Sequence, residues 1–254
     1  MSIDMVPARF FNELKALPPF VRVGTFDRRI SKAPLPPKQA FLPGLFLFGH
    51  ARGYRLPTWE SFRDYYLRAI KQHKSYNTKF AQNFEANGEP KQGLLWRMSG
   101  WYEDSMAHAF LYSVLVLAYE DIDQSAFVLY DARADWKFKA DFIILRHTGS
   151  DAKAVRINVY GQTDDERTQV ELERDCQERQ MKVNTSTSAH WGNETYRTLP
   201  VANISKAVGD VIVTQNFRLF SPESMEQLMD DVDAALQHKR KKKTIEDLLL
   251  YRVR

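Results

Sequence analysis

Hydrophobic and polar residues alternate along residues 137–160, on both sides of the sequence TGSD. A period of two is typical of β-strands that bury one face, and the turn-forming residues of TGSD separate two such strands. The two apolar faces coincide in one register, because a slip by one residue would bury the charged side chains. That register pairs Ala140 with Val159, Phe142 with Ile157 and Ile144 with Val155. The pattern therefore predicts a β-hairpin with one buried face.

The same register places polar side chains together on the other face of the hairpin. Asp141 lies opposite Asn158, and Lys139 lies opposite Tyr160. The aspartate has two interpretations at this point. It contributes to a metal site, or it caps a backbone group or faces solvent.

Periodicity predicts further helices and strands around the hairpin. Residues 103–121 are apolar around almost the whole helix circumference after Met106, so this helix is expected to be buried. Residues 221–237 carry Ser221 as the N-cap and Pro222 at the first helical position, before an apolar stripe. The other predicted elements are helices at 57–74 and 164–182, strands at 125–131, 138–145, 154–160 and 210–214, and loops at 75–100 and 185–200.

The chain divides by composition into three predicted regions. Eight of the 11 prolines lie in residues 1–57, which are expected to form an extended arm rich in proline and aromatic residues. Residues 58–236 are expected to form an α/β core domain, in which the aromatic residues of the 57–74 helix belong to the core. Residues 237–254 are expected to form a basic tail with a short helix.

Charge is distributed unevenly along the chain, although the net charge is only +4. Lys and Arg outnumber Asp and Glu by 16 to 7 in residues 1–100 and by 7 to 2 in residues 237–254, whereas acids lead by 23 to 13 between them. Basic ends around an acidic middle suit a polyanion or an acidic protein as partner, and they also suit an ordinary solvated surface. The run Lys239, Arg240, Lys241, Lys242 and Lys243 either contacts nucleic-acid phosphates or serves as a solubilising linker.

Several functional classes lack their sequence marks in this chain. The N-terminus does not have the pattern of a secretion signal, no apolar stretch reaches the length of a membrane span, and Cys176 is the single cysteine. We therefore expect no membrane and a reducing, cytoplasmic setting. The Gly-rich dinucleotide and P-loop motifs and the GxSxG motif are missing, and the histidines show no metal-ligand spacing.

The predicted order of elements from Glu103 to Thr214 is helix, three strands, helix, strand, with Asp141 in the second strand. This αβββαβ order resembles the core of the PD-(D/E)xK, or restriction-endonuclease-like, nuclease superfamily. The resemblance implies an α/β (α+β) fold in which helices flank a mixed sheet.

The resemblance also implies roles for the polar residues of the hairpin. Asp141 would be the aspartate of the second strand, and Asn158 would stand where the second acid usually does. The family lysine falls at position 160, where this chain has Tyr160, and Lys139 on the same face would substitute for it. Glu103 would match a helical glutamate that adds a metal ligand, and one or two Mg²⁺ ions would polarise the phosphate.

Two functions follow as hypotheses. The first is a Mg²⁺-dependent DNA endonuclease, or a subunit of one, for which the family resemblance suggests a mobile-element or defence context. The second is a catalytically inactive interaction subunit that uses the same scaffold in a larger assembly, with the proline-rich arm and basic tail lying against a partner.

Overall fold

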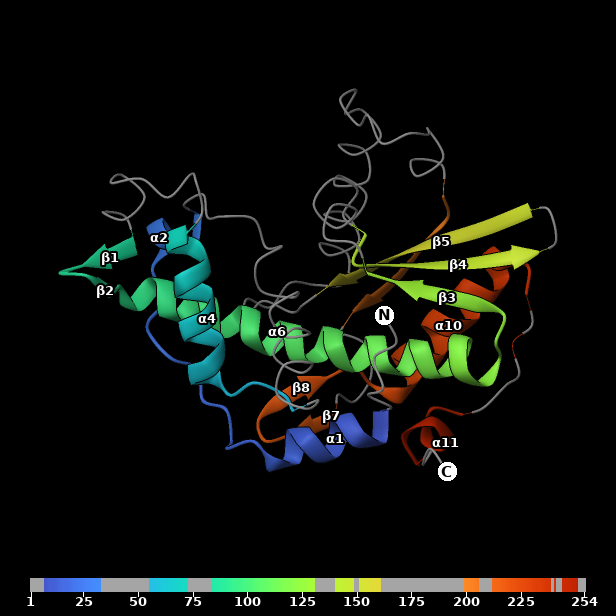
Figure 1. The fold of residues 1–254 in the computed structure, drawn as a ribbon, viewed down its shortest axis with the longest axis horizontal. Coiled ribbons are helices and arrows are strands. Elements are labelled where there is room, and N and C mark those ends of the chain that lie inside the picture. Colours follow the sequence, from blue (N-terminus) through green and yellow to red (C-terminus); the bar gives the residue numbers. More distant parts are fainter. Residues whose placement is uncertain are drawn as a thin grey trace, which may run out of the picture. The chain divides into compact units, whose positions relative to one another are not determined.

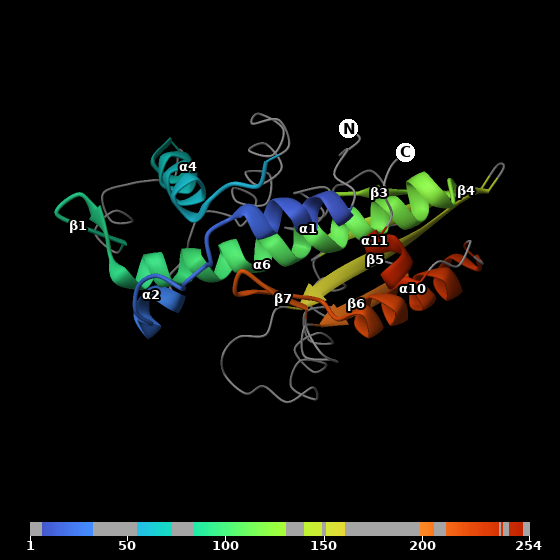
Figure 2. The same ribbon diagram turned by 90° about the horizontal axis from the view of Figure 1, so that it is seen from below.

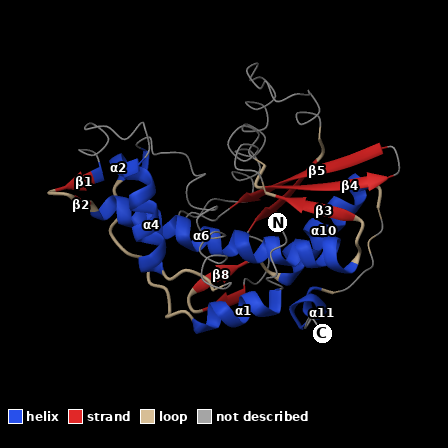
Figure 3. Cartoon of the chain, in the orientation of Figure 1, coloured by secondary structure: helices blue, strands red, loops and turns tan. Residues whose placement is uncertain are grey.

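A computed structural model shows an α+β protein in which helices flank a mixed four-stranded sheet (Figures 1 and 3). Contacts divide the chain into two compact units, which are described separately. The sheet unit comprises residues 1–9, 110–212 and 219–254, and the aromatic unit comprises residues 10–109 and 213–218. The residues that the structure describes are 7–32, 55–72, 84–130, 140–148, 151–160, 199–205, 212–238, 240 and 244–250.

The sheet has the strand order β3-β4-β5-β6. Its strands are β3 (Ala126–Leu129), β4 (Phe142–Thr148), β5 (Asp151–Tyr160) and β6 (Val201–Ser205). The first three strands run antiparallel, whereas β6 pairs parallel to β5. Phe142 pairs with Ile157 and Ile144 pairs with Val155, which confirms the hairpin and its register.

One face of the sheet forms the core of the sheet unit, because its apolar side chains are buried against helices. Helix α6 (Gln92–Val116) continues into the π-helix η2 (Leu117–Ile122), and the latter contacts β3. Helix α10 (Pro222–Leu236) packs on β5 and β6, as can be followed in Figure 2. The fully buried residues of this core face are Phe142, Ile144, Val155 and Ile157.

Helix α10 begins and packs as the sequence predicts. The Ser221 hydroxyl accepts a hydrogen bond from the Ser224 N–H at 3.0 Å, and Pro222 occupies the first turn. The whole apolar stripe is buried, namely Met225, Leu228, Met229, Val232 and Leu236. Capping and periodicity are local signals, so this helix is readable from the sequence.

The outward edge of β3 is closed by side chains of the preceding helices. The Val128 N–H donates to Glu120 Oε1 at 2.6 Å, and the Val128 carbonyl accepts from the Tyr112 hydroxyl at 3.1 Å. Unpaired strand edges offer backbone groups to other chains. Glu120 and Tyr112 therefore satisfy the groups through which a further strand would pair at this position.

The aromatic unit is built around ring packing. Helix α4 (Trp59–Gln72) supplies aromatic residues to its core, as predicted, and the Tyr102 hydroxyl donates to the Pro57 carbonyl at 2.6 Å. Ring centroids of neighbouring residues are 5.2–6.1 Å apart, within the usual range for tilted and stacked pairs. The cluster comprises Phe20, Trp59, Phe62, Tyr102 and Phe217.

Helix α6 begins at Gln92, which corrects the predicted loop over 75–100 and the predicted helix start at 103. Before it lies a short hairpin of β1 (Glu85–Ala86) and β2 (Glu89–Pro90). Two glycines of this helix allow close packing. A Cβ at Gly93 would lie 2.8 Å from Ile30 Cδ1, and one at Gly100 would lie 2.6 Å from the Arg22 guanidinium.

The predicted extended arm also needs correction. Residues 1–57 contain the helices α1 (Pro7–Ala16) and α2 (Arg28–Lys32), while residues 33–54 lie outside the described residues. Phe10 and Leu14 are both buried, and their spacing of four residues places them on one side of α1. Burial of this apolar pair stabilises α1. The prolines nearby in the sequence had favoured an extended arm instead.

The predicted strand 210–214 is present as β7 (Ile212–Thr214), but β7 pairs with β8 (Phe217–Leu219) rather than with the four-stranded sheet. Gln215 and Asn216 both have positive φ angles, of 48° and 64°, as a tight hairpin turn requires. The predicted 164–182 helix lies outside the described residues. The short helix of the tail is α11 (Ile245–Leu250).

Candidate functional site

The hairpin brings together two of the residues predicted for the site. Asp141 directly precedes Phe142 and Asn158 directly follows its partner Ile157, so both adjoin the first pair of the β4–β5 ladder. The Asp141 N–H donates to the Ile157 carbonyl at 2.9 Å, and Asp141 Oδ2 accepts from the Val159 N–H at 2.7 Å. The carboxylate therefore satisfies a backbone donor where the ladder ends, which is the capping interpretation.

The other predicted site residues fall elsewhere or outside the described chain. Glu103 is half-buried on α6 and belongs to the aromatic unit. Arg240 is buried and forms an ion pair with Asp233. Lys139, Lys239, Lys241, Lys242 and Lys243 lie outside the described residues.

The described residues around Asp141 give no support to the expected Mg²⁺ site. This ion prefers several hard oxygen ligands, usually including more than one carboxylate. Among the residues that the structure describes, no group of three or more His, Cys, Asp or Glu is placed to hold a metal ion. The cation Arg156 lies on the same strand and face as Asn158.

Arg156 is a residue that the sequence analysis assigned no role. It lies on the second face of the sheet, opposite the core face, and its residue is only 3% exposed. The Arg156 N–H donates to the Pro200 carbonyl at 2.9 Å, and Nη2 donates to the Leu199 carbonyl at 3.4 Å. Burial lowers the pKa of Arg156. Alternation predicts its face, but its burial depends on tertiary structure.

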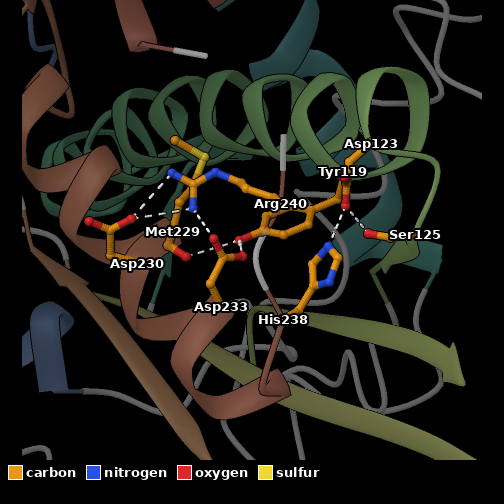
Figure 4. Close-up of polar contacts among 8 residues, drawn as sticks. All are labelled: Tyr119, Asp123, Ser125, Met229, Asp230, Asp233, His238 and Arg240. Carbon is orange, nitrogen blue, oxygen red and sulfur yellow. Dashed lines mark hydrogen bonds and ion pairs between the residues drawn. The ribbon is translucent and has the colours of Figure 1, made fainter. Parts of the chain in front are cut away.

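A buried polar cluster joins η2 to the end of α10 (Figure 4). The Tyr119 hydroxyl lies 3.0 Å from Asp233 Oδ1 and 3.1 Å from the Met229 carbonyl, and Arg240 pairs with the other Asp233 oxygen. Burial, followed by the nearby Asp233 charge, raises the pKa of Tyr119 far above its ordinary value. The phenol therefore stays protonated and serves as a hydrogen-bond donor.

The second half of this cluster contains a serine, a histidine and an aspartate. His238 Nε2 lies 2.6 Å from Asp123 Oδ2, and Ser125 Oγ contacts the same oxygen (Figure 4). Nucleophilic catalysis needs the histidine between the serine and the acid, so that it takes the serine proton. Here the aspartate lies in the middle, which indicates that the cluster connects segments of the fold.

A group of exposed and half-buried arginines and aromatic residues lies in the aromatic unit. The Phe26 ring is 59% exposed and meets the Trp96 ring edge-on at 5.1 Å, while the Arg22 guanidinium lies 4.0 Å from the Trp96 ring centroid. Arg28 and Arg29 are exposed at the start of α2. We call Arg22, Phe26, Arg28, Arg29 and Trp96 the arginine–aromatic patch.

Backbone geometry at Gly24 positions this patch. Gly24 has a φ angle of 89°, and a Cβ there would overlap the Gln92 carbonyl and lie 2.6 Å from the Trp96 nitrogen. Only glycine allows the segment to approach α6 so closely, with Arg22 and Phe26 both reaching Trp96. The Asp27 carboxylate accepts from the Arg29 N–H at 2.8 Å, which caps α2. The patch leaves no local pattern in the sequence, because its contacts join residues about 70 positions apart.

Comparisons with known protein families, curated proteins and solved structures found no match to this chain. Among the described helices, none combines the length and apolar character that a bilayer span requires.

Proposed function

We propose that the protein is nucleic-acid-associated and that it binds a single strand through the arginine–aromatic patch. The supporting observation is the exposed Phe26 ring beside Trp96, with the Arg22 guanidinium stacked on the indole. Bases stack on such rings without sequence preference, and arginines neutralise the adjoining phosphates. Arg28 and Arg29 supply two exposed cations next to the rings in sequence.

The proposal concerns binding, with hydrolysis as a separate question. Asp141 accepts the Val159 N–H, and no group of three or more His, Cys, Asp or Glu among the described residues is placed to hold a metal ion. The endonuclease hypothesis keeps one supporting observation, the adjacent positions of Asp141 and Asn158 beside the β4–β5 ladder. Mg²⁺-dependent cleavage of plasmid DNA that Asp141→Asn abolishes, with the fold intact, would establish catalysis.

Fluorescence anisotropy with a labelled oligo(dT) strand tests the proposal. Removing a stacking ring costs about 1–3 kcal/mol per base, so Phe26→Ala is expected to weaken binding about tenfold. The double change Arg28→Gln, Arg29→Gln is expected to reduce the slope of log affinity against log salt by about 1.4.

Matched controls separate the patch from general surface effects. Phe127 is 54% exposed in the sheet unit, so Phe127→Ala removes a similarly exposed ring outside the patch. Arg218→Gln removes an exposed arginine outside the patch. Equal losses for Phe26→Ala and Phe127→Ala would refute the assignment to the patch, and no binding by the wild type would refute the proposal.

The second candidate function is an interaction subunit of a larger assembly. Phe127 and Leu129 are 54% and 42% exposed on the second face of β3, which favours contact with another protein. A complex that Phe127→Ala, Leu129→Ala dissociates, measured by light scattering, would support this function over the first.

A further inference from the structure

Arg156 is buried at the middle of the second face of the sheet. Its register partners are Ile143 on β4 and Val201 on β6, and the Ile143 residue is only 5% exposed. Both register partners carry apolar side chains, and burial removes the guanidinium from water. Burying a charged guanidinium costs free energy of hydration unless an opposite charge or several hydrogen bonds compensate it.

The described contacts of Arg156 do not compensate its charge. A guanidinium has five N–H donors, whereas the side chain makes one long hydrogen bond, from Nη2 to the Leu199 carbonyl at 3.4 Å. Nε is buried and lacks an acceptor, and no carboxylate within the described part of the chain forms an ion pair with Arg156. The guanidinium therefore has a buried donor, Nε, that no acceptor satisfies.

Two amide side chains also lie on this face of the sheet, two residues further along β5 and β6. Asn158 follows Arg156 on the same face of β5, and Asn203 is the register partner of Asn158 on β6. Amide groups donate hydrogen bonds without adding negative charge, and arginine recognises oxyanions by paired N–H donors. The nearby carboxylate of Asp141 accepts the Val159 N–H. One cation and two amides on adjoining strands thus form a suitable donor set for an oxyanion.

We propose that Arg156, Asn158 and Asn203 form an oxyanion site that takes a phosphate group. The site belongs to the sheet unit and does not depend on the arginine–aromatic patch, which belongs to the aromatic unit. The phosphate comes either free in solution or as the terminal phosphate of a nucleotide. Both sources present the same oxygens to the arginine, so the experiment distinguishes them.

Calorimetric titration of the full chain with inorganic phosphate tests the site, with chloride at equal ionic strength as the reference. The wild type is expected to bind saturably and to unfold at a higher temperature as phosphate is added. Arg156→Met is expected to lose both responses while staying at least as stable as the wild type without phosphate, because it removes a buried charge. Arg156→Lys keeps the charge but not the paired donors, so binding should weaken about tenfold.

Further variants keep the test decisive if Arg156→Met fails to fold. Asn203 is exposed, so Asn203→Ala is expected to fold and to bind phosphate several-fold more weakly. Phe26→Ala and Arg218→Met are controls that should bind phosphate like the wild type. Titration with thymidine 5′-monophosphate identifies the source, with thymidine as the control that lacks a phosphate. Binding of the nucleotide equal to that of free phosphate indicates a terminal phosphate. Binding of free phosphate alone indicates a free anion.

Three results would overturn the site. The first is an absence of saturable phosphate binding to the wild type. The second is equal phosphate binding by the wild type, Arg156→Lys and Asn203→Ala. The third is a loss of stability in Arg156→Met that is the same at every phosphate concentration, which would show that Arg156 only anchors the Leu199 carbonyl. None of these results depends on oligonucleotide binding at Phe26, so the two proposals fail separately.

Discussion

The Asp141 side chain accepts a hydrogen bond from the backbone at the end of the β4–β5 ladder. Its Oδ2 accepts the Val159 N–H at 2.7 Å while its own N–H donates to Ile157. Asp141→Ala leaves the Val159 donor without this acceptor, so we expect the free energy of unfolding to fall by about 1–3 kcal/mol.

Denaturant titration of Asp141 variants measures this effect. Asp141→Asn keeps an acceptor oxygen of the same reach and is expected to lose less stability than Asp141→Ala. If Asp141 were a strained metal-binding acid, its substitution would instead raise the free energy of unfolding. An increase in stability in either variant would therefore contradict the capping role.

Tyr112 gives the protein a dependence on alkaline pH. Burial, followed by the Glu120 charge, raises the pKa of Tyr112 to about 12. The ordinary value is near 10, so the folded state holds the phenol proton more tightly than the unfolded state. Its contribution to stability is complete below about pH 10 and is lost as the pH rises from about 10 to 12.

Thermal unfolding measured from pH 9 to 12 tests this dependence. Wild-type stability is expected to fall over the upper part of this range, and Tyr112→Phe should show a shallower decline because it has no proton to lose. Tyr65→Phe is the control, since it removes a half-buried phenol that does not contact Val128. An identical decline in the wild type and Tyr112→Phe would refute the assignment.

At the scale of elements, the closed edge of β3 has consequences for association. Glu120 accepts a hydrogen bond from the Val128 N–H, and the Tyr112 hydroxyl donates one to the Val128 carbonyl. Glu120→Ala exposes a backbone donor on a strand that also carries the exposed Phe127 and Leu129, so this variant is expected to form dimers or aggregates.

Light scattering across a concentration series measures that outcome. Asp121→Ala is the matched control, because Asp121 is an exposed acid on the same π-helix and is not an acceptor for Val128. Unchanged mass for Glu120→Ala at all concentrations would contradict the proposed protection of the edge.

Elements with local signals are those that the sequence predicts. Alternation gives the β4–β5 register, and Ser221, Pro222 and an apolar stripe give α10. The start of α6 escapes prediction because Gly93 and Gly100 act through tertiary contacts with Ile30 and Arg22. The adjacent positions of Asp141 and Asn158 follow from the register, whereas the burial of Arg156 depends on chain segments beyond the hairpin.

At the scale of the whole molecule, the basic tail takes part in a buried ion pair that composition does not reveal. Its Arg240 is buried against Asp233 and approaches Asp230 at 3.4 Å, although its neighbours in the sequence are lysines. His238 adds a contact with Asp123, a residue 115 positions away. These contacts attach the chain after α10 to η2 and α10 within the sheet unit, and such long separations leave no local pattern.

Arg240→Ala is therefore expected to destabilise the protein strongly. The change leaves the Asp233 charge buried with only the Tyr119 hydroxyl beside it, and breaking a buried pair in this way costs about 3–5 kcal/mol. Lys239→Ala removes the preceding charge in the sequence and is expected to change stability by less than about 0.5 kcal/mol. Replacing both partners, as Arg240→Met with Asp233→Leu, should recover most of the loss because no uncompensated charge remains. Urea unfolding of the three variants measures these changes in the free energy of unfolding. A decrease for Arg240→Ala no larger than that for Lys239→Ala would show that the arginine does not anchor the tail.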